Sequence, residues 1–282
     1  MRIGLPTTLF QDVPIEKAVE KLFKLGVECI EVVFDIPHFP PEKRGIEDLR
    51  RLKKALTQYG LPLSVHSCFY ELNLGGIYQA VRNFTLKEIR KCLKFAGLIE
   101  AEVVTVHPGY FPIHDDEVLL KKAMERFTED LNLCLKFSKE ENVQLSLENI
   151  QSPYFLFSKL ESAPEIVKKV KDLTITLDVG HAYIMECSSR KRSVEKKIAE
   201  KIENILGKKI GHLHIHDNFG VKDEHLVPGD GKINFKPIIK ALRKTGYNNQ
   251  VIVEAWNPRR SVDTGIKALK RVKTLFTNPP NF

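Results

Sequence analysis

Short apolar, β-branched runs alternate with longer amphipathic stretches along the whole chain. The strand-like runs lie near residues 2–5, 28–34, 61–66, 102–107, 143–148, 173–178, 209–216 and 250–254. The helical patterns lie near residues 14–25, 46–59, 84–99, 115–141, 164–171, 193–206, 235–245 and 262–276. Eight such units predict a closed parallel barrel, because an open doubly wound sheet usually has about five to seven strands. We therefore expect a single-domain α/β (β/α)8 TIM barrel over residues 1–276 and a tail over 277–282.

Polar residues in these strands share one face, which we expect to line the barrel lumen. In the seventh run, Leu213 and Ile215 alternate with His212, His214 and His216. Successive strand residues point to opposite faces, so the three histidines turn away from the covering helices. The same alternation recurs in the four preceding strands. We expect His212 to lie deepest, where its replacement affects stability more than turnover.

Six consecutive strands, the third to the eighth, end in a side chain that can bind a metal ion. These residues are His66, His107, Glu148, Asp178, His214 and Glu254. Barrel active sites form at this C-terminal rim, so the six side chains should converge. His181, Asp223 and His225 follow in the next loops. Buried carboxylates and imidazoles lose hydration, which divalent cations compensate, and nine ligands exceed what one ion uses. We therefore expect more than one ion.

Each of these residues also has a simpler explanation when it is taken alone. A histidine after a strand is usually hydrogen-bonded in the core or a loop, and Asp178 suits the N-cap of a following helix. Cys68, two residues past His66, is either a soft ligand or a buried bystander, and we favour the bystander. Parity alone does not decide whether His214 or His216 is the ligand from the seventh strand.

Composition excludes a disordered chain. Hydrophobic residues make up 43% and charged residues 28%, near the averages for soluble domains. The sequence lacks both a membrane-length apolar run and a secretory signal, so we expect a cytoplasmic protein with no membrane partner. Five widely spaced cysteines indicate reduced thiols. The net charge is +8, and residues 190–209 carry much of the excess. This segment is either a solvated helix face, which we favour, or a phosphate- or nucleic-acid-binding surface.

Eight short motifs occur in a fixed order along the chain. They are His66 with Leu-Asn-Leu-Gly at 72–75, His107-Pro-Gly, Leu-Glu148-Asn, Asp178-x-x-His181, His214-x-x-Asp217, Asp223-x-His225, Gly229-x-Gly231 and Glu254. With these motifs the chain resembles the endonuclease IV and xylose isomerase-like barrel superfamily over nearly its whole length. The resemblance implies that the nine candidate residues correspond to the trinuclear zinc ligands of endonuclease IV. It also selects His214 over His216 as the seventh-strand ligand.

Two motifs depart from endonuclease IV. That enzyme has Asp-Thr-Cys-His where this chain has Asp-Val-Gly-His at 178–181, and His-Leu-Asn-Asp where this chain has His-Ile-His-Asp at 214–217. Both forms look more like the sugar phosphate isomerase and epimerase branch of the superfamily. In that branch one divalent ion, often manganese, is held by residues that resemble Glu148, Asp178, His214 and Glu254.

The resemblance implies an isomerase or epimerase acting on a sugar or sugar phosphate, which is the function we favour. Glu148 and Glu254 would remove and return a carbon-bound proton from opposite sides of the rim. We expect His181, His216 and Trp256 to bind the substrate, and two to three zinc or manganese ions per chain.

The alternative is an endonuclease IV-type zinc phosphodiesterase (AP endonuclease) that acts on abasic DNA, for which all nine ligands would be used. Phe69, Tyr70 and the loop 37–40 are the candidates for contacting a duplex. A binding or regulatory protein on an inherited barrel is a third class. The sequence leaves the sugar, the metal and the oligomeric state open.

Overall fold

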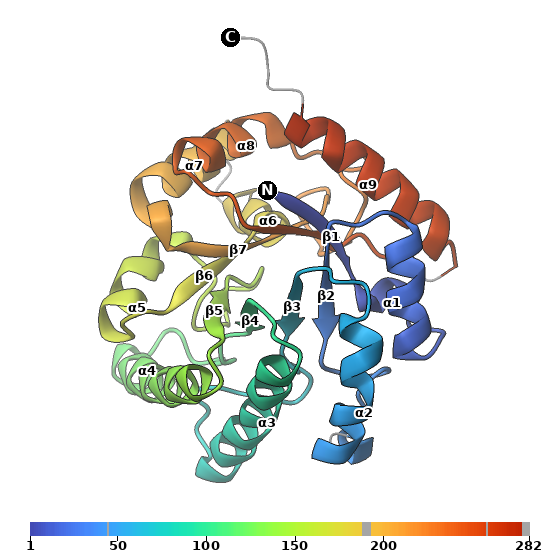
Figure 1. The fold of residues 1–282 in the computed structure, drawn as a ribbon. Coiled ribbons are helices and arrows are strands. Elements are labelled where there is room, and N and C mark those ends of the chain that lie inside the picture. Colours follow the sequence, from blue (N-terminus) through green and yellow to red (C-terminus); the bar gives the residue numbers. More distant parts are fainter. Residues whose placement is uncertain (44, 188–192, 258, 278–282) are drawn as a thin grey trace.

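The computed structural model describes residues 1–43, 45–187, 193–257 and 259–277. Eight parallel strands close into a barrel in sequence order, with β8 paired to β1 (Figure 1). The strands are β1 Arg2–Pro6, β2 Cys29–Val33, β3 Leu63–His66, β4 Val103–Val106, β5 Gln144–Glu148, β6 Thr174–Asp178, β7 Ile210–Ile215 and β8 Gln250–Val253. Each predicted strand is present, which confirms the (β/α)8 barrel.

Helices surround the barrel, and their apolar faces pack against the outer faces of the strands (Figure 1). Those predicted from the sequence are α1 Ile15–Lys24, α2 Ile46–Thr57, α3 Gln79–Leu98, α4 Glu117–Glu140, α5 Ala163–Lys169, α7 Val194–Lys201, α8 Phe235–Lys244 and α9 Ser261–Thr277. A π-helical turn, Ile202–Leu206, continues α7. The predicted tail begins at the last residue of α9, and residues 278–282 lie outside the described part. None of the described helices is both long and apolar enough to cross a membrane.

One further helix, α6 (Val179–Cys187), was not predicted from the sequence. Its residues are apolar on nearly every face, so they carry no amphipathic period. Figure 1 shows it inside the ring of the other helices. Asp178 caps its first turn, because Asp178 Oδ1 accepts a hydrogen bond from the backbone nitrogen of His181 at 2.6 Å. Strand β6 therefore passes directly into α6, which fixes Asp178 and His181 relative to each other.

The lumen contains buried polar side chains, as strand parity predicts. Thr176 Oγ1 donates a hydrogen bond to Ser146 Oγ at 2.7 Å and lies 3.0 Å from Thr105 Oγ1. On the adjacent strand β7, the Nε2 of His212 donates to Glu31 Oε2 at 2.9 Å. All five side chains are fully buried. The predicted deep position of His212 is therefore confirmed.

The basic segment 190–209 is partly balanced by acidic neighbours. Residues 190–192 lie outside the described part of the chain. In α7, Lys201 forms a close ion pair with Glu186 and another with Glu161 at 2.5 Å, and Lys197 lies 3.9 Å from Glu186. For Lys197 and Lys201, these pairs weigh against a phosphate-binding role.

We predict that His212→Ala lowers the free energy of unfolding by about 2–4 kcal/mol, because the change opens a cavity and removes a hydrogen bond to the buried Glu31 carboxylate. Urea denaturation followed by circular dichroism measures this loss. His114→Ala, which removes a partly exposed ring, is the control and should cost less than about 1 kcal/mol. Equal losses in the two variants would contradict the predicted role of His212.

Candidate metal centre and active site

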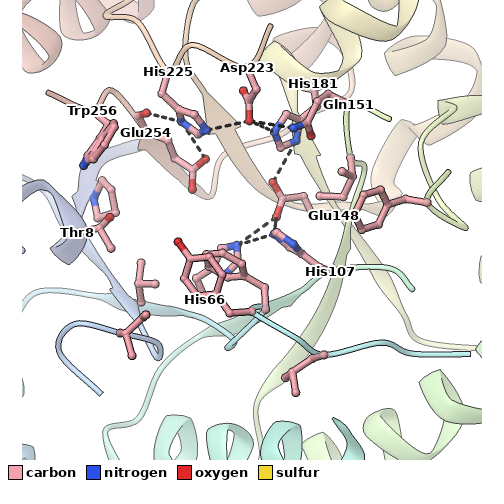
Figure 2. A pocket seen from close by; sticks show the side chains of 18 of the residues that line it. Thr8, His66, His107, Glu148, Gln151, His181, Asp223, His225, Glu254 and Trp256 are labelled. Atoms are coloured by element: carbon pink, nitrogen blue, oxygen red, sulfur yellow. Dashed lines mark hydrogen bonds and ion pairs between the residues drawn. The ribbon is translucent and has the colours of Figure 1, made fainter. Parts of the chain in front are cut away.

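A cavity of about 650 Å³ opens at the C-terminal end of the barrel, a size typical of small-molecule sites (Figure 2). Eight of the predicted site residues line it: His66, His107, Glu148, His181, Asp223, His225, Glu254 and Trp256. The other three, Asp178, His214 and His216, are fully buried and are not among the described residues that line the cavity. The barrel therefore brings the predicted residues to one end, where eight of them line the cavity and three are buried away from its surface.

Four of these residues, Glu148, Asp178, His214 and Glu254, form the central group, in which the candidate ligand atoms lie within 4.8 Å of one another. His214 Nδ1 is 3.2 Å from Glu148 Oε1 and 3.3 Å from Glu254 Oε1. Ligands of a tetrahedral zinc ion lie about 3.3 Å apart when each bond is about 2.0 Å long. Asp178 Oδ2 is buried without a hydrogen-bond partner. These spacings and the unpaired oxygen fit a divalent cation.

A second set, the entry group, consists of His66, His107 and Glu148 (Figure 2). The Nε2 atoms of His66 and His107 are 3.2 Å apart, and each lies 3.2 Å from Glu148 Oε2. A ring N–H points at only one acceptor, so hydrogen bonds cannot satisfy both ring nitrogens and the carboxylate oxygen at once. A cation placed between these three atoms can contact all of them. Glu148 thus faces the entry group with Oε2 and the central group with Oε1.

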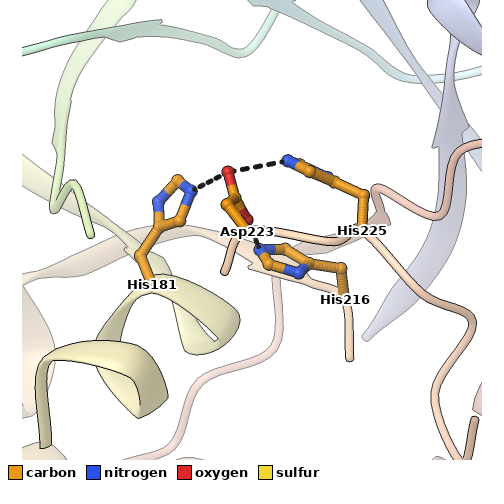
Figure 3. A group of neighbouring side chains, drawn as sticks. All are labelled: His181, His216, Asp223 and His225. Atoms are coloured by element: carbon orange, nitrogen blue, oxygen red, sulfur yellow. Dashed lines mark hydrogen bonds and ion pairs between the residues drawn. The ribbon is translucent and has the colours of Figure 1, made fainter. Parts of the chain in front are cut away.

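A third set, the loop group, consists of His181 from α6, His216 after β7, and Asp223 and His225 from the loop between β7 and α8 (Figure 3). Asp223 Oδ2 lies 3.2 Å from the Nε2 atoms of both His181 and His225. His216 Nε2 lies 3.3 Å from Asp223 Oδ1. Three of these four were predicted as metal ligands, and His216 was predicted only as a substrate-binding residue.

Backbone carbonyls select which ring nitrogen three of the histidines present. The Nδ1 atoms of His66, His181 and His225 donate to carbonyl oxygens at 2.8, 2.9 and 2.7 Å. Each Nε2 is consequently directed at the neighbouring carboxylate. Metal-binding histidines are usually oriented in this way, because the outer hydrogen bond fixes both the tautomer and the ring.

Sequence reasoning missed Glu31, which supports the central group from below. Its buried carboxylate lies 3.2 Å from His214 Nε2, so His214 turns its Nδ1 toward Glu148 and Glu254. Glu31, His212 and His214 are themselves close enough to hold an ion, but hydrogen bonds from both rings to Glu31 account for their proximity. The available signal was an acidic residue at an inward position of the otherwise apolar strand β2.

The two glutamates of the central group differ in their protonation behaviour. Burial raises the pKa of Glu254, and the charges of Glu148 and Asp178 raise it further against the effect of His214. Burial also acts to raise the pKa of Glu148, but His214 and the other histidines beside it hold that pKa well below its usual value. The site therefore contains one carboxyl that tends to hold a proton and one that tends to release it, which is the pattern of an acid and base pair.

Neighbouring carboxylates favour protonation of two histidines of the site. Burial acts to lower the pKa of His66, but Glu148 raises it to about 9. Burial likewise opposes protonation of His181, while Asp178 and Asp223 raise its pKa to about 10. A cation that binds these rings must therefore displace protons.

Asp217 organises the loop that carries Asp223 and His225. Its buried Oδ2 accepts hydrogen bonds from the backbone nitrogens of Gly229 and Gly231 at 2.8 and 3.0 Å. The motifs His214-x-x-Asp217 and Gly229-x-Gly231 are thus two halves of one loop scaffold.

The aromatic residues considered for DNA contact differ in their positions. Phe39 is buried in the core, and His38 Nε2 lies within 3.2 Å of two backbone carbonyl oxygens. Phe69 stacks on His107 with ring centroids 4.9 Å apart, and Tyr70 is exposed beside it. Phe69 and Tyr70 line the cavity, whereas the loop 37–40 is anchored in the barrel core.

All five cysteines are free thiols, as predicted. Cys68 is buried and belongs to none of the ligand groups found among the described residues. This position supports the prediction that Cys68 is a bystander.

The family model described as the xylose isomerase-like TIM barrel matches residues 19–272. The chain belongs to this family. An uncharacterized protein of Methanocaldococcus jannaschii is 30% identical over 93% of the chain and 86% of its own length. Fructoselysine 3-epimerase of Escherichia coli O157:H7 is 26% identical over 90% of each chain. A solved structure of a D-tagatose 3-epimerase-like protein aligns with a TM-score of 0.81 and 28% identity, covering 98% of both chains.

We predict that Glu31→Gln weakens manganese binding about 10- to 100-fold, because the carboxylate that orients His214 is lost while the shape of the side chain is kept. Competition with a chromophoric chelator measures the affinity. Glu102→Gln is the matched control, since Glu102 pairs with Arg2 at the opposite end of the barrel. Unchanged affinity in Glu31→Gln would show that Glu31 does not position the ligand.

Proposed function

We propose that this protein is a divalent-metal-dependent isomerase or epimerase of a sugar or sugar phosphate. The observation that carries the proposal is the pair Glu148 and Glu254, whose carboxylate oxygens lie 3.2 and 3.3 Å from His214 Nδ1 at the cavity floor. The relatives named fructoselysine 3-epimerase and D-tagatose 3-epimerase-like protein support it. A cavity of about 650 Å³ suits a small substrate.

The central group would hold the catalytic cation, zinc or manganese. When bound, this ion supplies Lewis acidity toward the adjacent oxygens of a hydroxy-carbonyl substrate and so acidifies the proton on the carbon between them. Glu148, the carboxylate that tends to stay ionised, removes that proton and breaks the C–H bond. Glu254, the carboxyl that tends to stay protonated, delivers a proton to the opposite face of the same carbon. One proton then passes from Glu148 to Glu254 through solvent and restores the starting state.

One other cavity residue has a position suited to substrate binding. Trp256, which is half exposed, lies at the wall beside Glu254 and offers a flat apolar surface to a sugar ring (Figure 2). His181 was also expected to bind the substrate, but its Nδ1 donates to the backbone oxygen of Asn149 and its Nε2 faces Asp223, so we do not give it that role. His216 was expected to bind the substrate as well, but it is fully buried and away from the cavity wall. We therefore do not give His216 that role.

A zinc-dependent phosphodiesterase of the abasic-DNA type is the second candidate. The observation that favours it is that all nine predicted ligands converge in three groups, of which two share Glu148. Two to three ions in such groups would suit phosphoester cleavage, where neighbouring ions activate water and stabilise the leaving oxygen. The burial of Phe39 and the anchoring of His38 leave the loop 37–40 without the exposed aromatic that would grip a duplex.

We predict that Glu148→Gln and Glu254→Gln each lower kcat at least about 1,000-fold, because the amide cannot exchange a proton with carbon. Turnover at saturating substrate and metal is the measurement, with metal content determined for each variant. Glu224→Gln is the control, since Glu224 lies on the same loop side of the barrel but lines no part of the cavity. Near-normal turnover in Glu254→Gln would contradict the acid and base assignment.

We predict that solvent deuterium enters at least one member of a panel of ketoses, ketose phosphates and inososes when the protein is loaded with zinc or manganese. Proton exchange requires only a metal-bound hydroxy-carbonyl and a base, whereas strand cleavage also requires a surface that bends DNA. Mass spectrometry detects the exchange, and a duplex with one abasic site is incubated in parallel. The proposal would be overturned in favour of the nuclease by efficient incision at physiological salt that is lost in Glu254→Gln, together with no deuterium exchange in any sugar.

A further inference from the structure

Gly180 leaves the space that the ring of His216 occupies. A Cβ atom at Gly180 would lie 2.1 Å from Cε1 and 2.3 Å from Nε2 of His216, distances that non-bonded atoms do not reach. The ring also stacks on His225, with centroids 4.2 Å apart and planes 22° from parallel, and meets His181 edge-on at 5.4 Å. The absent side chain in the first turn of α6 therefore admits a third imidazole to the loop group.

Hydrogen bonds do not account for the position of His216. The side chain is fully buried, and neither ring nitrogen has a hydrogen-bond partner. Its Nε2 lies 3.3 Å from Asp223 Oδ1, which also lacks a hydrogen-bond partner, and 3.2 Å from Asp178 Oδ1. Buried polar atoms are nearly always paired. The two ring nitrogens of His216 and Asp223 Oδ1 are therefore exceptions, and a bound cation would provide the missing partner.

The other two histidines of the loop group, His181 and His225, both direct Nε2 at Asp223. Nδ1 of His181 and of His225 donates to a backbone carbonyl, so the Nε2 of each neutral ring carries a lone pair directed at Asp223 (Figure 3). Each of these rings therefore meets Asp223 either in its protonated form or across a bound cation that has displaced the proton. The spacing of 3.2 Å matches that of adjacent ligands in a tetrahedral zinc site, which is about 3.3 Å.

We propose that His181, His216, Asp223 and His225 bind a zinc ion in a closed site that is structural and takes no part in the reaction. Three imidazole nitrogens and one carboxylate oxygen fill the four positions of tetrahedral zinc, so none remains for water or substrate. This inference goes beyond the proposed function, because it adds His216 as a ligand and gives the ion a role that does not depend on turnover.

The site ties three separate elements together. Its ligands come from α6, from the end of β7 and from the loop between β7 and α8. Asp223 and His225 form part of the cavity wall, and His225 Nδ1 donates to the backbone oxygen of Glu254. Zinc in the loop group therefore holds this loop against the barrel and keeps the backbone of Glu254 in place.

The two groups differ in the metal that they favour. The loop group offers three imidazoles and one carboxylate, a donor set that selects zinc over manganese. The central group offers three carboxylates and one imidazole, which suits a harder ion such as manganese. The chain thus separates a structural zinc ion from the ion of the reaction site.

The test measures the zinc content of the full-length protein and of His216→Ala after dialysis against a weak chelator and excess manganese. We expect the variant to hold one zinc ion fewer per chain. Cobalt substituted for zinc should give the intense visible absorption of a four-coordinate ion in the unaltered protein, and this absorption should be lost in the variant. Amide hydrogens of residues 217–234 should exchange about tenfold faster once zinc is absent. His114→Ala, a histidine outside the ligand groups, should change none of these readouts.

His225→Ala is the second variant, in case His216→Ala does not fold. The ring of His225 is 29% exposed, so its removal takes away a ligand without opening the core. Zinc content and a cobalt spectrum that stay unchanged in the folded variants would overturn the proposal and show that protonated imidazoles pair with Asp223 instead. These readouts do not use turnover. Loss of one zinc ion in an enzyme that exchanges no sugar proton would support this site and count only against the proposed function.

Discussion

Glu148 shares its two carboxylate oxygens between two sets of imidazoles, and the other charges at the barrel rim depend on this arrangement. Oε2 lies 3.2 Å from both His66 and His107, and Oε1 lies 3.2 Å from His214. A buried carboxylate is stable only when positive charge or hydrogen-bond donors surround it. The same carboxylate raises the pKa values of Glu254 and His66, so its loss would alter the charge state of the whole site.

The strand ends are held rigidly around this carboxylate. Asn149 follows Glu148, and its side chain forms two hydrogen bonds of 2.9 Å with the backbone of Asp178 on the neighbouring strand. Asp178 uses Oδ1 to cap α6 and leaves Oδ2 for the central group. Below them, Glu31 orients His214. Side chains that are fixed in this way before a substrate arrives need little rearrangement during a reaction, which is the condition for efficient electrostatic catalysis.

The two departures from the endonuclease IV motifs are one structural feature. Gly180 stands in the first motif and His216 in the second, and the missing side chain of Gly180 is what admits the ring of His216. A sequence comparison treats these positions as independent, because 35 residues separate them. Their contact explains why a larger residue at 180 would be incompatible with this position of His216.

The sequence by itself determined the barrel, the inward parity of the strands and the nine candidate ligands, because these follow from local periodicity, from positions at strand ends and from short spacings in the loops that come next. Even His212 could be placed in the lumen from alternation alone. The tertiary structure alone decided how the ligands divide into groups, since that depends on contacts between elements. The register shift between β6 and β7 sets Asp178 opposite His214, and Glu31 is recognised as a partner only once β2 and β7 face each other across the lumen. Helix α6 carries no amphipathic pattern because it is buried on nearly every side, so the sequence did not predict it. Only the folded structure shows that Gly180 in this helix leaves room for the ring of His216.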